Sequence, residues 1–85
     1  MKEFTYVITD PEGIHARPAG ELVKAAKEFQ CSIKLEKDGK AGDCKKIFGI
    51  MGLGVKNGNE VRMTFDGADE DAAYTAISKF MQEKL

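Results

Sequence analysis

The stretch Gly13-Ile14-His15-Ala16-Arg17-Pro18-Ala19-Gly20 places the only histidine of the chain directly ahead of a well-marked helix. From residue 19 onward the apolar residues recur with helical spacing, which predicts a helix with one buried face. These residues are Ala19, Leu22, Val23, Ala26 and Phe29. Pro18 fits only near the start of a helix, because a backbone N–H in the first turn has no intrahelical partner to lose. His15 is therefore expected at, or just before, the helix N-terminus.

This position suits a side chain that carries a negatively charged group. A helix N-terminus presents unpaired backbone N–H groups and the positive end of the helix dipole. Arg17 adds a cation two residues beyond the histidine. One ring nitrogen of an imidazole can be fixed by a hydrogen bond while the other stays free as a nucleophile. A phosphoryl group accepted by His15 would thus meet Arg17 and the backbone N–H groups of Ala16 and Arg17.

Length and composition limit the classes of protein that fit. The chain has 85 residues, of which 42% are hydrophobic and 32% charged, and its formal net charge is −1. This length suits one domain with a modest core, so residues 1–85 are expected to form a single domain. The balanced charge disfavours a general nucleic-acid or membrane binder, and no apolar run is long enough to span a bilayer. Without the apolar core of a signal peptide, the chain is expected in the cytoplasm.

The pattern beyond the first helix predicts four strands and two more helices. Strands are expected at residues 4–8, 31–36, 40–44 and 61–65, where apolar and polar residues alternate. A short helix is expected within residues 45–54, and a longer one after the acidic residues 69–71. The inner face of the last helix should carry Ala73, Ile77, Phe80 and Met81. The order is β-α-β-β-α-β-α, and strands with one apolar face require helices on that face alone.

The dipeptide Asp38-Gly39 is a strong signal for a two-residue hairpin turn. Counting outward from this turn gives three facing pairs, which are Lys37 with Lys40, Leu35 with Gly42 and Ile33 with Cys44. Cys44 is then expected on the core face, diagonal to Cys31. Two cysteines so far apart in sequence, without a second histidine, do not form a metal site. We expect buried, reduced thiols and no bound metal.

The segment Lys45-Lys46-Ile47-Phe48-Gly49-Ile50-Met51-Gly52-Leu53-Gly54 is unusually apolar for a short connection. A helix here would bury Ile50 and Leu53. It would then expose a patch that suits a transient protein contact and consists of Ile47, Phe48 and Met51. The alternative is that all of these side chains belong to the core, and the sequence does not decide between the two.

Residues 13–19 match in full the pattern G-[I/L]-H-[A/T]-R-P-A, and they resemble the active-site segment of the HPr family. These proteins are the histidine-containing phosphocarriers of the bacterial phosphoenolpyruvate-dependent sugar phosphotransferase system. The resemblance covers essentially the whole chain, including a second family signature at residues 45–54. It implies a carrier rather than an enzyme, which takes a phosphoryl group from enzyme I and passes it to the IIA domains of sugar permeases. His15 would carry the group on Nδ1, Arg17 would stabilise it, and no cofactor is implied.

The resemblance also implies the fold and the docking surface. The fold is α+β, an open-faced β-sandwich in which a four-stranded antiparallel sheet has three helices on one face. The docking residues that carry over by position are Ala16, Arg17, Gly20, Lys24, Lys27, Ile47, Phe48 and Met51, and Lys45 and Lys46 add to a basic rim. Acidic residues gather instead at residues 66–71, a polarity that can steer the His15 face toward acidic partners. A carrier that shows one face to several partners is expected to be a monomer.

Two residues depart from the family pattern. In many relatives the residue before the Ile47-Phe48 pair is a serine, which a dedicated kinase of Gram-positive bacteria phosphorylates to control carbon catabolite repression. Lys46 occupies that position here and cannot accept the phosphate, so regulation by such a kinase is not expected. Glu12 stands where relatives often carry a small polar residue. A carboxylate close to the imidazole would favour the protonated ring.

Two other functions stay open at this point. An HPr-like paralogue could serve a regulatory phosphorelay, such as a nitrogen-related branch, or report to transcriptional regulators, because the histidine motif is the same. A KH-like nucleic-acid-binding module is the alternative from a different class, since Gly49-Ile50-Met51-Gly52 has the form of a GXXG loop. The two middle residues are apolar here rather than basic, and the net charge gives little electrostatic affinity, so no nucleic-acid partner is expected.

Overall fold

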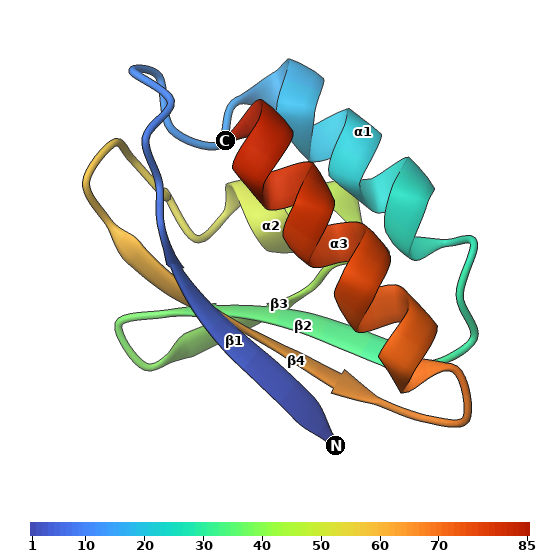
Figure 1. Ribbon diagram of the computed structural model, residues 1–85. Coiled ribbons are helices and arrows are strands. Elements are labelled where there is room, and N and C mark those ends of the chain that lie inside the picture. Colours follow the sequence, from blue (N-terminus) through green and yellow to red (C-terminus); the bar gives the residue numbers. More distant parts are fainter.

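A single sheet lies beneath three helices (Figure 1). The computed structural model describes residues 1–85. Its elements, in chain order, are β1 (Lys2–Val7), α1 (Ala16–Ala26), β2 (Ser32–Lys37), β3 (Lys40–Asp43), α2 (Ile47–Met51), β4 (Glu60–Asp66) and α3 (Glu70–Lys84). The strands are antiparallel and lie in the order β1-β4-β2-β3. The predicted α+β open-faced sandwich and its element order are confirmed.

The core forms between the covered face of the sheet and the helices. The central strand β4 shows the alternation clearly, because Val61, Met63 and Phe65 are buried while the residues between them point to the other face. The buried residues of the two long helices are Pro18, Ala19, Leu22 and Ala26 on α1, and Ala73, Ile77 and Met81 on α3. Phe80, predicted on the inner face, is only partly buried. None of the helices has the length and apolar character of a membrane span.

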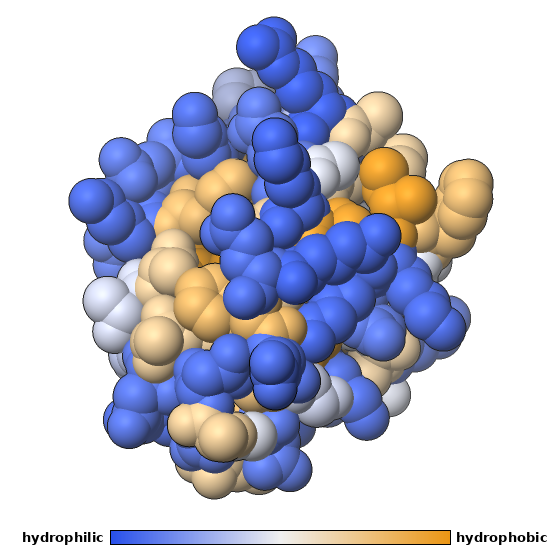
Figure 2. All heavy atoms as spheres, turned by 90° about the vertical axis from the view of Figure 1, so that its right-hand side faces the viewer, coloured by the Kyte–Doolittle hydropathy of each residue, from blue (hydrophilic) through white to orange (hydrophobic).

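The side of the molecule along which α1 runs has both hydrophilic and hydrophobic surface. Figure 2 views the side that lies to the right in Figure 1, where α1 runs. A band of hydrophilic side chains crosses this side between two areas of apolar surface. Glu21 and Lys24 on α1 and Lys27 at its C-cap are exposed, which accounts for hydrophilic surface over this helix.

The hairpin register agrees with the count from the turn. Lys37 faces Lys40 and Leu35 faces Gly42. The Cys44 N–H donates to the Ile33 carbonyl at 2.9 Å, which adds the third pair. Both cysteines are free and buried. Burial raises the pKa of the Cys44 thiol to about 12 and is also the main cause that raises the pKa of Cys31, so both thiols stay protonated at neutral pH.

Strand β2 begins at Ser32 and not at Cys31 as predicted, because a carboxylate takes up the preceding backbone donors. The N–H groups of Gln30 and Cys31 donate to the two carboxylate oxygens of Asp69, at 2.7 and 2.8 Å. Asp69 is the N-cap residue of α3, but its side chain makes no capping bond there. It therefore ties the start of α3 to the connection between α1 and β2. The hydrogen bond from Gln30 is the main cause that lowers the pKa of Asp69.

Replacing Asp69 with asparagine is expected to destabilise the protein near neutral pH more than in acid. The pKa of Asp69 is lower in the folded state than in the unfolded state. Its stabilising contribution is therefore complete above about pH 4, the unfolded value, and is lost as the pH falls through the folded value. Urea unfolding of both proteins near pH 7 and at about pH 2.5 measures this difference. An equal difference in the free energy of unfolding between wild type and Asp69→Asn at both pH values would contradict the prediction.

Candidate functional site

His15 is the N-cap residue of α1, as the position of Pro18 predicts. Its backbone is extended, with φ −106° and ψ −176°, and the helix begins at Ala16. The His15 carbonyl accepts the N–H of Ala19 at 3.0 Å. The side chain, in contrast, makes no capping hydrogen bond. The imidazole is thus placed at the helix N-terminus without being used to cap it.

The loop that carries His15 is held by main-chain contacts with residues 55 and 56. The Ile14 N–H donates to the Val55 carbonyl at 3.0 Å. Gly13 has φ +68°, and a Cβ added there would lie 2.4 Å from the Val55 oxygen and 2.5 Å from the Cα of Lys56. Only glycine allows the two backbones to approach so closely in this conformation. The residue two positions before the histidine therefore determines how the loop sits on the segment before β4.

The end of α3 holds the other side of the same loop. The main-chain oxygen of Leu85 accepts the N–H of Thr9 at 2.7 Å, the N–H of Asp10 at 3.0 Å and the Thr9 hydroxyl at 2.9 Å. The Leu85 side chain is buried. These contacts bring Lys84, the preceding residue, next to the histidine loop.

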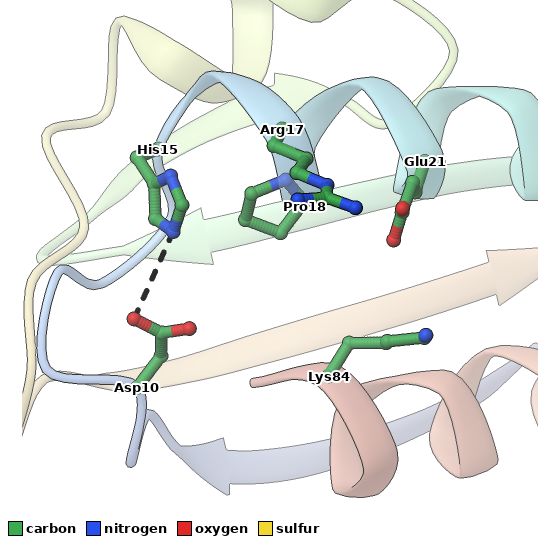
Figure 3. A pocket seen from close by; sticks show the side chains of 6 residues that line it. All are labelled: Asp10, His15, Arg17, Pro18, Glu21 and Lys84. Carbon is green, nitrogen blue, oxygen red and sulfur yellow. Dashed lines mark ion pairs between the residues drawn. The ribbon is translucent and has the colours of Figure 1, made fainter.

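An open pocket of about 230 Å³ lies beside the imidazole (Figure 3). The residues that line it are Asp10, His15, Arg17, Pro18, Glu21 and Lys84. Figure 3 shows Arg17 and Glu21 on α1, with Lys84 on α3 across from them. Neither Arg17 nor Lys84 forms an ion pair within 4.0 Å. Two cations and a helix N-terminus therefore lie around one pocket together with the carboxylates of Asp10 and Glu21. The cations and the helix N-terminus are groups that can hold a phosphate-sized anion next to the ring.

Two carboxylates face one edge of the imidazole. The Oε2 atom of Glu12 lies 3.4 Å from Nε2 of His15, and Oδ1 of Asp10 lies 3.8 Å from the same nitrogen. Asp10 is held in place because its Oδ1 also accepts the N–H of Glu12 at 2.8 Å. Glu12, which the sequence marked as a departure from the family pattern, therefore lies close to the ring. No group of three or more His, Cys, Asp or Glu side chains is placed to hold a metal ion.

Asp10 and Lys84 are site residues that the sequence did not single out. Asp10 reads as an ordinary turn residue, since it stands before Pro11. Lys84 reads as a favourable charge at a helix C-terminus. Their place in the pocket depends on the contacts of Leu85 with the loop, which link segments at opposite ends of the chain.

Helix α2 exposes part of the apolar patch considered for it. Phe48 is 86% exposed and Met51 39% exposed, whereas Ile50 is buried. Ile47 and Leu53 are partly buried and pack against the core, so neither reading of the sequence holds for all five side chains. The residues compared with a GXXG loop lie in this helix and its C-cap, with one middle side chain buried. A KH-like loop is therefore not formed.

The lysines assigned to the basic rim differ in what they contact. Lys24 is exposed on α1, Lys27 is exposed at its C-cap, and Lys46 is exposed at the N-cap of α2. Lys45 is only partly exposed, and its ammonium donates to the carbonyl of Phe29 at 2.7 Å. That bond satisfies a main-chain oxygen just beyond α1 and fixes the charge of Lys45 there. The sequence could not distinguish this lysine from its neighbour.

The first-helix residues and the α2 patch lie close together. Helices α1 and α2 meet at Gly20, where an added Cβ would lie 4.0 Å from Cδ1 of Ile47. Ala16 and Arg17 are exposed at the start of α1. The second turn of α1, the helix whose N-cap residue is His15, therefore lies against Ile47 of α2.

Comparisons with known proteins agree with this geometry. A family model described as the PTS HPr component phosphorylation site matches residues 2–83. The phosphocarrier protein HPr of Lysinibacillus sphaericus is 40% identical over 83 residues, which cover 98% of this chain and 94% of that protein.

Two solved structures are also similar over nearly their whole length. HPr from Thermoanaerobacter tengcongensis has a TM-score of 0.94 and 43% identity, covering 99% of this chain and 94% of that one. A histidine-containing phosphocarrier protein from a mycoplasma has a TM-score of 0.94 and 38% identity, covering 96% of this chain and 93% of that one. The likeness therefore extends to the whole fold and not only to the histidine segment.

Proposed function

The chain belongs to the HPr family of phosphocarrier proteins of the phosphotransferase system, and from this premise we propose the transfer that it performs. Residues 1–85 act as one phosphocarrier domain that accepts a phosphoryl group from phosphorylated enzyme I on Nδ1 of His15. The same atom then donates the group to the IIA domains of sugar permeases. The protein carries the group between enzymes and needs no cofactor of its own.

The observation that carries this proposal is that the imidazole of His15 lies at the start of α1 and makes no capping hydrogen bond to the helix. Nε2 faces the carboxylates of Asp10 and Glu12. Figure 3 shows the other ring nitrogen on the side of α1, and this nitrogen is Nδ1. A lone pair on Nδ1 is thus available to attack phosphorus, next to the free N–H groups of the first helical turn.

Phosphoryl transfer demands mainly positioning and charge neutralisation, because little covalent chemistry is left to the protein. Arg17 and the backbone N–H groups of Ala16 and Arg17 stabilise the phosphoryl oxygens. Lys84 supplies a second cation from the opposite wall of the pocket. The helix dipole of α1 acts in the same direction.

Enzyme I and the IIA domains dock on the surface around His15. Its apolar centre is formed by Ile47, Phe48 and Met51, and the residues at its edge are Ala16, Arg17, Gly20, Lys24, Lys27, Lys45 and Lys46. An apolar centre with a charged rim gives short-lived contacts and fast, electrostatically steered encounter with acidic partners. Because Lys46 has no hydroxyl, a serine kinase does not regulate this surface at that position.

Replacing Phe48 with alanine is expected to weaken docking without weakening the fold. An aromatic side chain at the centre of an interface commonly contributes enough to raise the KM for enzyme I about tenfold. Because Phe48 is 86% exposed, its loss should change the free energy of unfolding by less than about 0.5 kcal/mol. Steady-state phosphorylation kinetics and urea unfolding measure the two effects.

Val7→Ala is the matched control, because Val7 is exposed on the sheet face that carries no helix. It should leave the KM unchanged. Equal KM values for Phe48→Ala and wild type would place the docking surface elsewhere.

The proposal is tested by the intact mass of the protein after incubation with phosphoenolpyruvate, Mg²⁺ and a bacterial enzyme I. We expect a gain of one phosphoryl group that acid removes, as a phosphoramidate bond requires. Transfer from the purified phosphorylated protein to a IIA domain then tests the second step. No gain of mass with a cognate enzyme I would overturn the proposal.

A further inference from the structure

The pair of carboxylates at the edge of the His15 ring is not used by the chemistry described above. Asp10 and Glu12 both approach Nε2, the nitrogen that does not carry the phosphoryl group in the proposed function. Each distance exceeds that of an ordinary hydrogen bond, which joins nitrogen and oxygen at about 2.7–3.2 Å. At these distances each carboxylate attracts an N–H group at Nε2 without forming a hydrogen bond of ordinary length.

The two carboxylates differ in mobility. Asp10 is only 23% exposed and is fixed by the hydrogen bond from the Glu12 N–H, so its oxygen stays beside the ring. The Glu12 side chain is 73% exposed, and its carboxylate contacts no other side chain within ion-pair distance. Glu12 is thus free to turn its carboxylate toward Nε2–H.

We propose that Asp10 and Glu12 are positioning residues that keep the proton on Nε2 of His15, before and after phosphorylation. This inference rests on the proposed function for its consequence, but not for its first test. In the unphosphorylated protein the proton on Nε2 leaves the lone pair on Nδ1, which makes Nδ1 the nucleophile. The carboxylates thereby determine which of the two ring nitrogens reacts.

In the phosphorylated protein the same proton determines how easily the group leaves. Transfer breaks the P–Nδ1 bond, the electron pair of that bond stays on Nδ1, and phosphorus forms a bond to the next nucleophile. If Nε2 keeps its proton, the departing group is neutral imidazole. If Nε2 is bare, the departing group is an imidazolate anion, which leaves far less readily. Asp10 and Glu12 therefore favour the form of phosphohistidine that transfers its group.

The other charged groups around the ring do not take this role. Arg17 and Glu21 face the pocket from α1, and Lys84 faces it from α3. Arg17 and Lys84 are cations and cannot accept a hydrogen bond from Nε2–H, and Glu21 forms no ion pair with His15. Only the two loop carboxylates are placed to attract a proton on Nε2.

The first test uses the unphosphorylated protein with ¹⁵N-labelled histidine, which gives signals from one ring because the chain has one histidine. The ring nitrogens are compared in wild type, in the double variant Asp10→Asn/Glu12→Gln and in Glu28→Gln, at a pH where the ring is neutral; Glu28 is exposed and lies outside the pocket. We expect wild type and Glu28→Gln to carry the proton on Nε2 and the double variant to show a larger share on Nδ1. The same proton distribution in all three proteins would overturn the inference without touching the proposed function.

The second test follows the loss of the phosphoryl group to water near neutral pH, by ³¹P NMR. Here a water oxygen forms the new bond to phosphorus, and its proton passes to solvent. Loss should be about threefold slower in the double variant, the effect of removing exposed ionic contacts, and unchanged in Glu28→Gln. An equal slowing in Glu28→Gln would mean a general effect of the net charge and would contradict a specific role at Nε2. Failure of every protein to become phosphorylated would count against the proposed function, and the ring nitrogens would still decide this inference.

Discussion

His15→Ala is expected to abolish acceptance of the phosphoryl group and to leave the fold almost unchanged. The chain has no second histidine, and both cysteines are buried with raised thiol pKa values, so no other side chain offers a comparable nucleophile. The side chain of an N-cap residue often stabilises a helix by about 1 kcal/mol. His15 makes no such capping bond, so this loss does not arise. The melting temperature should therefore stay within about 3 °C of wild type.

Intact-mass measurement with enzyme I and thermal unfolding by circular dichroism check the two halves of this result. Phe48→Ala, which keeps the histidine, serves as a control that should still reach full phosphorylation at high enzyme I. A phosphoryl group on His15→Ala would assign the chemistry to another residue. A cooperative unfolding transition is needed to show that the variant is folded.

Gly13→Ala is expected to cause the largest loss of stability among single methyl additions in the histidine loop. The added Cβ would meet main-chain atoms of residues 55 and 56 at 2.4 and 2.5 Å, and neither backbone segment is free to move far. The positive φ of 68° adds strain for any residue with a side chain. Together these effects should lower the free energy of unfolding by about 2–4 kcal/mol and the melting temperature by at least about 10 °C.

Gly54→Ala separates the two causes, because Gly54 has a similar φ of 64° and no atom within 4 Å of an added Cβ. The free energy of unfolding of Gly54→Ala should be only about 1 kcal/mol below that of wild type, because only the backbone conformation is strained. Urea unfolding of both variants measures the difference. Equal losses would show that the close approach of the loop to Val55 is not what requires glycine at position 13.

Much of the fold could be predicted because it depends on local signals. The hairpin register follows from Asp38-Gly39, since a two-residue turn fixes every pair counted from it. Residues 38 and 39 both have positive φ, as such a turn requires. The start of α1 follows from Pro18, which excludes helix more than one turn before it. In each case a single residue restricts the backbone strongly enough to be read from sequence.

The surroundings of His15 could not be predicted to the same extent. The motif identifies the histidine and Arg17, and Glu12 stands out only as a departure from the family pattern. Lys84, however, reaches the pocket only because Leu85 binds the backbone of Thr9 and Asp10. Likewise, the contact of Lys45 with the Phe29 carbonyl depends on how the segment before α2 packs beneath the end of α1. Contacts between distant segments leave no local pattern.

The strand order has a consequence for the folding kinetics. β2 and β3 pair across a two-residue turn, whereas β1 pairs with β4 across most of the chain, from Lys2 with Phe65 to Val7 with Glu60. Closing so long a loop is slow compared with forming a hairpin, so β1 is expected to join the sheet late. β1 leads directly into the loop of His15. The proposed phosphate site is then expected to be among the last parts of the molecule to assemble, after the hairpin and the helices have formed.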